Sequence, residues 1–343
     1  MDITIKKLLD QIGDLNNFKR TCLNNDFKDI HIIRFYSSYV LIANGRVVEV
    51  TDSCMKYCPL AGFLYKDINL TDNPSLVKKS IKRAIESKIS KFGYFTEQRE
   101  LFSRDIAIPY GASEILMYAL KKKFIDAAIV VCDGAGTVIV DKPEIVQGIG
   151  ARMNGVFYTS PIKGIIKKLK EEGSYVVFQD GAISQIKAIK KAASLGYKNI
   201  AVTINASMDE PLDMIRKIES DLKISVTALA ICTTGLNIDR IQEVGKYTDI
   251  VWSCASRKLR MIIGKKAIAQ LSRKIPVFIL TKKGLNLVSS YSSNENLIKN
   301  LDLSKQYIIT GDLKGKNLKM GIFNAYLNET VLPVRHKKEP VLG

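Results

Sequence analysis

Residues 200–254 read IAVTINASMDEPLDMIRKIESDLKISVTALAICTTGLNIDRIQEVGKYTDIVWSC. Three apolar runs in this stretch predict buried strands at Ile200–Ile204, Val226–Cys232 and Asp249–Cys254. The two segments between these runs have the apolar spacing of amphipathic helices. Near-continuous apolar strands that alternate with helices are typical of a parallel sheet covered on both faces. This stretch therefore predicts an α/β fold.

The same alternation continues on both sides of this stretch. Further strands are predicted at Ala127–Cys132, Tyr175–Phe178 and Pro276–Thr281. We therefore expect a mostly parallel, doubly wound sheet with helices on both faces. The predicted helices lie near residues 161–172, 183–195, 209–222, 237–247, 256–272 and 282–290.

A small antiparallel unit is predicted before this core. The runs His31–Phe35, Tyr39–Ala43 and Arg46–Thr51 are rich in β-branched and aromatic residues, which favour strands. Asn44-Gly45, between the last two runs, is a strong signal for a type I′ hairpin turn. We therefore expect an N-terminal β-hairpin unit.

These patterns divide the chain into three predicted segments. Residues 1–70 hold an amphipathic helix and the antiparallel β unit, and residues 71–290 form the α/β core. In residues 291–343 the regular alternation of strands and helices is lost and basic residues accumulate. We expect this last segment to be a basic C-terminal extension that is partly loose.

The composition indicates a globular protein. With 343 residues, of which 46% are hydrophobic, the chain can bury a large core without a disulfide or a metal. Its longest apolar runs, such as Ile200–Ile204 and Val277–Leu280, are far shorter than the roughly 20 residues that span a bilayer. Residues 1–28 lack the compact apolar core and cleavage site of a signal peptide. We therefore expect a cytoplasmic protein without a membrane span.

The chain carries a formal net charge of +18, and most of the excess lies near its C-terminus. Residues 255–343 contain 17 basic and 5 acidic side chains. Such a field attracts nucleic acid, anionic cofactors or an acidic protein partner, although many lysine-rich surfaces are only solvated. Nucleic acid is the weakest of these interpretations, because Tyr291, Tyr307, Phe323 and Tyr326 are too dispersed to form a stacking platform.

Cysteine is scattered along the chain and histidine is scarce. The sequence has six cysteines and only two histidines, His31 and His336. Scattered cysteines in a chain of this length suit a reducing compartment, so we expect them as thiols or metal ligands. The scarcity of histidine argues against Ser-His-Asp, Cys-His and histidine-based zinc mechanisms, because each needs at least one histidine in the site.

Three cysteines end predicted strands, namely Cys132, Cys232 and Cys254. The carboxyl ends of parallel strands meet at one edge of a sheet, where ligands bind. Cys54 and Cys58 lie in the loop after the hairpin, and a proline follows Cys58, as it often follows cluster ligands. We predict an iron–sulfur cluster or another thiolate-bound metal on Cys58, Cys132 and Cys254, with Cys54 and Cys232 as further candidates. Packing of buried thiols is the alternative.

Glycine- and hydroxyl-rich turns follow the same strand ends and could bring backbone amides close to a small anionic ligand. The turn after Cys132 joins a strand to a strand, whereas a dinucleotide-binding fingerprint joins a strand to a helix. Cys254 precedes a predicted helix and two basic residues, so it is also a candidate nucleophile. The residues predicted to bind a ligand are Asp133, Gly134, Gly136, Thr137, Arg152, Thr233, Thr234 and Gly235.

Six motifs together resemble one protein family. They are KYCPL (56–60), FGYFTEQR (92–99), GASEIL (111–116), VCDGAGTVIV (131–140), VQGIGAR (146–152) and CAS (254–256). These motifs resemble methanogenesis marker protein 8 over roughly residues 30 to 290, and CDGAGT is the most specific block. The family occurs mainly in methane-producing archaea, so the resemblance implies an anaerobic setting and a role tied to methanogenesis.

The cysteines, the resemblance and the basic charge lead to three functional hypotheses. The first is a metal- or iron–sulfur-binding accessory protein that assists the maturation of a partner, a methanogenic enzyme such as methyl-coenzyme M reductase. The second is an enzyme that acts on a small anionic substrate or cofactor at the glycine and threonine loops. The third and least favoured is a basic module that binds nucleic acid.

Overall fold

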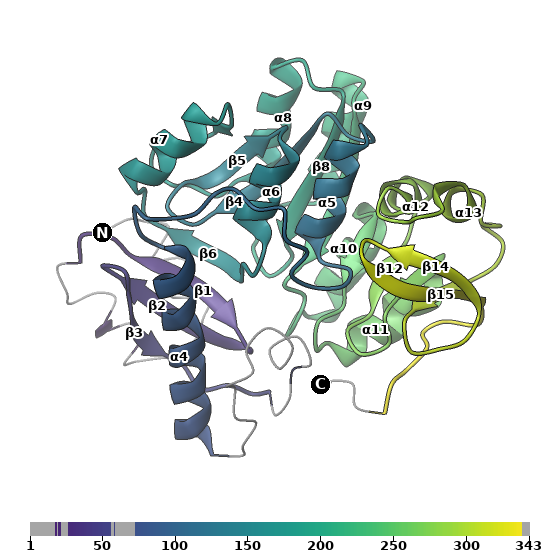
Figure 1. Cartoon of the computed structure of the whole chain (residues 1–343), viewed down its shortest axis with the longest axis horizontal. Coiled ribbons are helices and arrows are strands. Elements are labelled where there is room, and N and C mark those ends of the chain that lie inside the picture. The colour runs from purple at the N-terminus through teal and green to yellow at the C-terminus, as the bar shows by residue number, and fades with distance from the viewer. Residues whose placement is uncertain (1–17, 19, 22–26, 56–57, 59–72, 338–343) are drawn as a thin grey trace. The chain divides into compact units, whose positions relative to one another are not determined.

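A computed structural model of the chain describes residues 18, 20–21, 27–55, 58 and 73–337, and the predicted first helix falls almost wholly outside this part. The chain divides into two compact units, and Figure 1 labels many of their elements. Strands β4 and β5 run through the division, because the turn between them belongs to unit 1. Unit 1 consists of Met1–Leu101, Val131–Val138 and Met153–Ile183, and unit 2 of Phe102–Val130, Ile139–Arg152 and Ser184–Gly343.

Unit 1 is built on an antiparallel sheet with the strand order β3-β2-β1-β6. The predicted hairpin is confirmed, since Asn44 and Gly45 both have positive φ, at 50° and 69°, as a type I′ turn requires. The elements of this unit are β1 (His31–Phe35), β2 (Ser38–Ala43), β3 (Arg46–Val50), α4 (Pro74–Phe92), β6 (Gly155–Thr159), α7 (Lys163–Glu171) and β7 (Tyr175–Val176).

The sheet of unit 2 is mixed, which corrects the expectation of a mostly parallel, doubly wound sheet. Its strands follow the order β14-β15-β13-β11-β12-β10-β9-β8-β4-β5. Neighbouring strands from β4 to β10 are parallel. Beyond β10 only β11 and β13 pair in parallel, and the other described pairs are antiparallel. The α/β class is therefore confirmed, and the parallel part is the centre of the sheet.

The helices and strands of unit 2 continue the alternation read from the sequence up to β10. No helix of the described residues is long and apolar enough to cross a membrane. The elements are α5 (Ala112–Lys121), β4 (Ala127–Cys132), β5 (Gly136–Val140), α6 (Pro143–Gly150), α8 (Gln185–Ser194), β8 (Asn199–Asn205), α9 (Asp213–Leu222), β9 (Ser225–Ile231), α10 (Ile238–Tyr247), β10 (Ile250–Trp252), α11 (Arg257–Ile263), the 3-10 helix η1 (Gly264–Lys266), β11 (Ala269–Leu271), β12 (Val277–Ile279), α12 (Lys282–Ser289), α13 (Glu295–Lys299), β13 (Tyr307–Thr310), β14 (Lys316–Met320) and β15 (Phe323–Glu329).

The antiparallel part of the sheet arises from short segments that the sequence pattern did not reveal. The predicted helix 256–272 is wrong in its second half, because α11 ends at Ile263 and Ala269–Leu271 is strand β11. A short loop joins β11 to β12, and so short a connection permits only antiparallel pairing. A strand of three residues shows no period from which it could be recognised.

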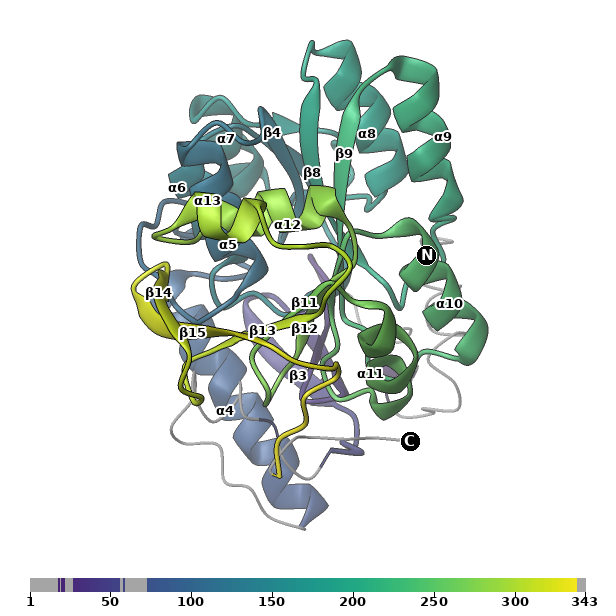
Figure 2. The ribbon, with the colours of Figure 1, turned by 90° about the vertical axis from the view of Figure 1, so that its right-hand side faces the viewer.

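The strands β8, β9 and β10 end level with one another. Asn199–Asn205 pairs one to one with Ser225–Ile231, and Val251 pairs with Ala230, so Trp252 ends β10 opposite the end of β9. Figure 2 shows helices on both sides of β8 and β9, with α8 and α9 on one side and α5 and α12 on the other. We call the ends at residues 205–208, 231–235 and 252–256 the carboxyl edge.

Much of the predicted C-terminal extension forms part of unit 2. Strand β13 pairs in parallel with β11, and β15 and β14 follow it as an antiparallel hairpin. Ile308 and Ile309 of β13 are buried, so this segment contributes to the core of the unit. Short strands separated by polar turns concealed this contribution in the sequence.

Candidate functional site

The carboxyl edge carries two cysteines with unusual backbone geometry. Cys232 directly follows β9 with a φ of 57°, and Cys254 lies just after β10 with a φ of 44°. Residues other than glycine rarely adopt this left-handed region, and each costs about 1–2 kcal/mol there. Both side chains are half-buried. Backbone strain of this kind clusters at functional sites, so the two strand ends are candidates for one.

The loops after β9 and β10 are joined by two threonine hydroxyls. Thr233 is fully buried, and its Oγ1 donates to the carbonyl oxygen of Trp252 at 2.6 Å. The backbone N–H of Ala255 donates to Oγ1 of Thr234 at 3.3 Å. Thr234 is half-buried and Gly235, with a φ of 83°, is exposed. Of the predicted Thr-Thr-Gly loop, the two threonines therefore help to fix the edge, and Gly235 is exposed.

The carbonyl oxygens of both cysteines are held by neighbouring side chains. Ser207, in the loop after β8, donates from Oγ to the carbonyl oxygen of Cys232 at 2.5 Å. Arg260 of α11 is buried and donates from Nη2 to the carbonyl oxygen of Cys254 at 2.5 Å. These bonds fix the backbone at both strained positions, which pre-organises the edge without using either thiol.

A buried hydroxyl lies between β10 and Cys254. Ser253 is 0% exposed, and among the described residues its Oγ has no hydrogen-bond partner. A buried polar atom without a partner costs about 1–3 kcal/mol, so native proteins rarely keep one without a role. The carboxyl edge therefore combines strained thiols with an unsatisfied hydroxyl.

The segment that begins at this edge is strongly basic. Residues 250–294 contain nine lysine and arginine residues and no aspartate or glutamate. Arg257 and Lys258, in the first turn of α11, are exposed, as are Lys265 and Lys266 of η1. Arg273 and Lys283 pair with Asp312 and Glu219, whereas Arg257 and Lys258 lie close to Cys254 in the chain and attract anions to the carboxyl edge.

In unit 1, the loop between β4 and β5 is closed by a buried ion pair. Arg99 donates from Nε to Oδ1 of Asp133 at 2.9 Å, and the backbone N–H of Phe95 donates to Oδ2 at 2.6 Å. Burial alone would lower the pKa of Arg99, but the Asp133 carboxylate raises it above the usual value. Both ions are fully buried, so Asp133 is occupied by protein groups in this structure.

The same loop is tied to the antiparallel sheet through a threonine and a histidine. The backbone N–H of Gly134 donates to Thr159 Oγ1 at 2.7 Å, and this oxygen lies 2.6 Å from Nδ1 of His31. Burial lowers the pKa of His31 to about 4, despite the carboxylates of Asp29 and Asp133. His31 is therefore neutral near pH 7. His31 and Thr159 are both buried, which indicates a structural array and not a nucleophilic one.

Gly136 and Thr137 are packed against backbone in unit 1. A Cβ atom at Gly136, which has a φ of 69°, would lie 2.3 Å from the carbonyl oxygen of Gly181. The backbone N–H of Thr137 donates to the carbonyl oxygen of Ala182 at 3.1 Å, and Thr137 is fully buried. Close packing thus requires a glycine at position 136, and the backbone of the loop is bonded to protein at Thr137.

The predicted metal ligands are distributed over both units. Cys58 and Cys132 belong to unit 1 and Cys254 to unit 2; of the further candidates, Cys54 belongs to unit 1 and Cys232 to unit 2. Burial, with the nearby Asp133 carboxylate, raises the pKa of the Cys132 thiol well above its usual value, so the thiolate that a metal needs is disfavoured. Within the described ranges, no three His, Cys, Asp or Glu side chains gather as a metal site. The metal site stays a prediction.

Of the predicted ligand residues, Arg152 is half-buried just after α6 with a φ of 61°. Three residues of the carboxyl edge were not predicted from the sequence, namely Ser207, Ser253 and Arg260. Ser207 and Ser253 follow apolar strands, which was a usable signal, whereas the contact of Arg260 with a carbonyl oxygen six residues earlier depends on the turn before α11.

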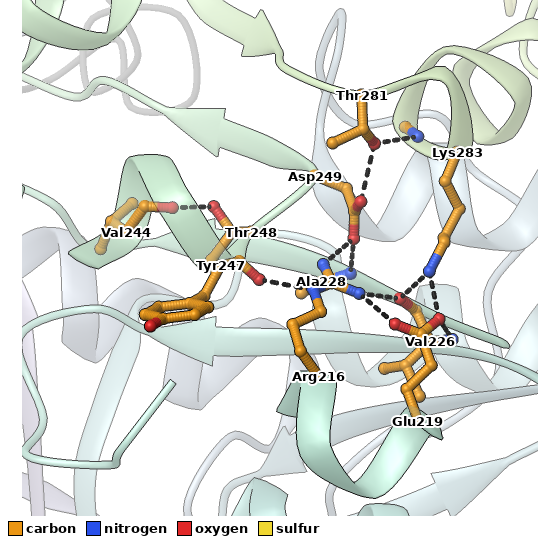
Figure 3. Close-up of polar contacts among 11 residues, drawn as sticks. Arg216, Glu219, Val226, Ala228, Val244, Tyr247, Thr248, Asp249, Thr281 and Lys283 are labelled. Atoms are coloured by element: carbon orange, nitrogen blue, oxygen red, sulfur yellow. Dashed lines mark hydrogen bonds and ion pairs between the residues drawn. The ribbon is translucent and has the colours of Figure 1, made fainter. Parts of the chain in front are cut away.

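The opposite end of the same strands holds a closed network of charges, which we call the amino edge (Figure 3). Asp249 accepts from Arg216 Nη2 at 2.6 Å, from the N–H of Ala228 and from Thr281 Oγ1. Glu219 binds both Arg216 and Lys283. Burial alone would raise the pKa of Glu219, but the bond from Lys283, with those of Arg216 and a backbone amide, lowers it.

Comparisons with known proteins place the chain in a family. A family model described as "Uncharacterized protein conserved in archaea (DUF2099)" matches residues 31–292. The chain belongs to this DUF2099 family. It is also 40% identical over 250 residues to "Uncharacterized protein MJ0054" of Methanocaldococcus jannaschii, which covers 73% of this chain and 85% of the relative. No solved structure matches the chain. The part that defines DUF2099 includes both cysteines of the carboxyl edge.

Proposed function

We propose that this DUF2099 protein binds a small anionic ligand at the carboxyl edge of unit 2 and acts on it there. The observation that carries the proposal is the strained pair Cys232 and Cys254 on neighbouring parallel strand ends. Parallel sheets bind ligands outside the carboxyl ends of their strands, because the connecting loops converge there. The pair stands where such a ligand would lie.

Three further features support a ligand at this edge. Gly235 offers an exposed backbone with a positive φ, directly after Thr234, which is bonded to Ala255 of the next loop. The hydroxyl of Ser253 is buried without a partner among the described residues. Arg257 and Lys258 supply exposed positive charge in a segment free of carboxylates. Together they offer hydrogen bonds and charge of the kind that fixes an anion.

Thermal-shift titration with inorganic phosphate and pyrophosphate tests this proposal. Ligand that binds only the folded state raises Tm, and binding at about 100 times Kd adds about 2.7 kcal/mol to the free energy of unfolding. The expected result is a saturable rise in Tm with at least one anion, which Thr234→Val and the double variant Arg257→Gln/Lys258→Gln weaken.

A matched double variant controls for the loss of charge. Lys314→Gln/Lys316→Gln removes two exposed lysines at the start of the β14–β15 hairpin, away from residues 252–258 in the chain. It should leave the titration unchanged. Equal weakening by both double variants, or no rise in Tm with either anion, contradicts the proposal, since only a diffuse charge effect would then remain.

A metal-binding accessory role, inferred from the cysteines and the family resemblance, is a second candidate. The observation that favours it is the pair of half-buried thiols at one strand edge, because soft metals select thiolate ligands. Anaerobic purification followed by iron and sulfide analysis tests it. Stoichiometric iron that Cys254→Ser abolishes would support the role, and colourless, metal-free protein would contradict it. The link to a methanogenic enzyme rests on the resemblance.

A further inference from the structure

The backbone of the carboxyl edge brings Cys232 and Cys254 close to one another. Val251 pairs with Ala230 in the parallel ladder of β9 and β10, so continuing this register places Ser253 opposite Cys232. Neighbouring strands lie about 4.8 Å apart, so two cysteines that follow the level ends of β9 and β10 leave the sheet side by side. Cysteines joined by a disulfide have Cα atoms about 4.4–6.8 Å apart.

Hydrogen bonds hold this spacing beyond the ends of the two strands. Thr233 donates to Trp252, which precedes Cys254 in the chain, and Thr234 accepts from Ala255, which follows Cys254. The two residues that follow Cys232 therefore contact the chain on both sides of Cys254. Because both cysteines have positive φ, the regular alternation of side chains between the two sheet faces ends at them.

The pair differs from two other cysteines of the chain. Cys132 is fully buried and its thiol pKa is raised, first by burial and then by Asp133, so it is inert at neutral pH. Cys54 is exposed, and its Sγ lies 3.2 Å from Oγ of Ser37. Cys232 and Cys254 are half-buried, which leaves them accessible to a small molecule while the edge holds their backbone.

We propose that Cys232 and Cys254 form a dithiol centre that reduces anionic disulfides of low molecular weight by thiol–disulfide exchange. The inference rests on the proposed function for its substrate class, because the basic residues Arg257 and Lys258 select the anion. It deepens that function by naming the groups that react. The dithiol itself rests only on the register and the hydrogen bonds of the edge.

The reaction consists of two exchanges. One cysteine thiolate attacks a sulfur of the substrate disulfide, the substrate S–S bond breaks, and the first substrate thiolate leaves with the electron pair. The second cysteine thiolate then attacks the protein sulfur of the mixed disulfide, forms the Cys232–Cys254 bond and releases the second substrate thiolate. Two electrons pass from the cysteines to the substrate, and the two cysteine protons end on the released thiols.

Differential alkylation with peptide mapping tests the dithiol. Reduced full-length protein is treated under anaerobic conditions with oxidised glutathione, an anionic disulfide, or with cystamine, a cationic one, and free thiols are then alkylated. Trypsin places the two cysteines on separate peptides, residues 224–240 and 247–257. The expected product is a disulfide between these two peptides, released with two equivalents of glutathione thiol.

The charge of the probe tests the substrate class separately. Steering by fixed charge changes association rates by factors of about 10 to 1,000, so oxidised glutathione should react at least about tenfold faster than cystamine at low salt. A linked disulfide that forms equally fast with both probes overturns the anionic substrate class and counts against the proposed ligand site. Mixed disulfides without a link between the two peptides overturn the dithiol centre, whatever the titrations with phosphate show.

Single-thiol variants complete the test. Cys232→Ser and Cys254→Ser should each stop at a mixed disulfide with glutathione on the remaining cysteine, with one equivalent of thiol released. Cys54→Ser, which removes an exposed thiol in unit 1, should retain the linked product. Loss of the link in Cys54→Ser, or its survival in either carboxyl-edge variant, overturns the assignment. A far-UV spectrum and Tm for each variant confirm that it is folded.

Discussion

The two ends of the parallel strands in unit 2 differ in how their polar groups are used. At the amino edge, Asp249, Glu219, Arg216 and Lys283 neutralise one another through direct ion pairs (Figure 3). At the carboxyl edge, Arg257 and Lys258 are exposed in a segment that contains no carboxylate, and the hydroxyl of Ser253 has no partner among the described residues. Ion pairs that stabilise the fold lie at one end of these strands, and exposed cations and a hydroxyl without a partner lie at the other.

This difference follows from the geometry of the parallel strands. At the amino edge, Asp249 lies before β10 and accepts from the backbone of β9, so its carboxylate holds two strands together. At the carboxyl edge the backbone leaves the strands at two left-handed residues, Cys232 and Cys254, whose side chains are half-buried. A protein can saturate the first end for stability and keep the second for binding.

Removal of the central carboxylate should have the largest effect. Asp249→Ala leaves the guanidinium of Arg216 and the N–H of Ala228 without their partner, and breaking a buried pair costs about 3–5 kcal/mol. Urea unfolding followed by circular dichroism measures the loss. Asp239→Ala, at an exposed position in the first turn of α10, should cost less than about 1 kcal/mol. Equal losses in the free energy of unfolding for Asp249→Ala and Asp239→Ala would contradict a special role of the amino edge in stability.

The buried histidine of unit 1 should give the next largest effect, as a function of pH. Its folded pKa of about 4 lies below its ordinary value of 6.5, so the unfolded chain binds more protons between these values. Stability from the neutral ring is therefore present above pH 6.5 and is lost as pH falls toward 4. From pH 7.5 to pH 5 the loss should be about 2 kcal/mol. His31→Gln should lack this part of the pH dependence, and an unchanged profile would contradict a neutral His31.

A buried hydroxyl of the carboxyl edge should matter less than the amino-edge carboxylate. Thr233→Val keeps the shape of the side chain and removes the bond to the carbonyl oxygen of Trp252, at a cost of about 1–2 kcal/mol. Thr227→Val, which replaces a buried threonine inside β9, serves as a control for burial of a hydroxyl. A cost above about 3 kcal/mol at Thr233 would make the carboxyl edge as important for stability as the amino edge.

Relief of backbone strain should have the smallest effect. Cys254→Gly removes about 1–2 kcal/mol of left-handed strain, while glycine costs about 0.5–1 kcal/mol in chain entropy. The free energy of unfolding should therefore stay the same or rise by up to about 1.5 kcal/mol, although the reaction with oxidised glutathione loses its linked product. A loss of more than about 2 kcal/mol would show that Cys254 serves stability.

The sequence predicted the α/β class and the parallel centre because these depend on local apolar patterns. Ile200–Ile204 and Val226–Cys232 are long enough for their character to be read, whereas β11 is three residues and is fixed by its neighbours. The strand ends were likewise readable, since Cys232 and Cys254 follow apolar runs. The bonds of the polar groups there could not be predicted, because Thr233 and Thr234 form them with the chain around Cys254, about 20 residues further on.

The Cys-Asp-Gly-Ala-Gly-Thr block shows the limit of motif reading. Its glycines and its aspartate suggested a ligand loop, but Asp133 meets Arg99, and Gly136 packs against the backbone of Gly181. Arg99, 34 positions away in the chain, supplies the counter-ion of Asp133, and no local sequence pattern predicts this pair. A distinctive motif can thus reflect close packing as well as chemistry.

Hydrogen–deuterium exchange with and without pyrophosphate tests the central claim most directly, because it reports both ends of the strands at once. Protection is expected in the peptides that cover residues 231–240 and 252–258, with no change in α9 or at Asp249 and Thr281 of the amino edge. Protection at the amino edge, or equal exchange in both states at the carboxyl edge, would contradict the account.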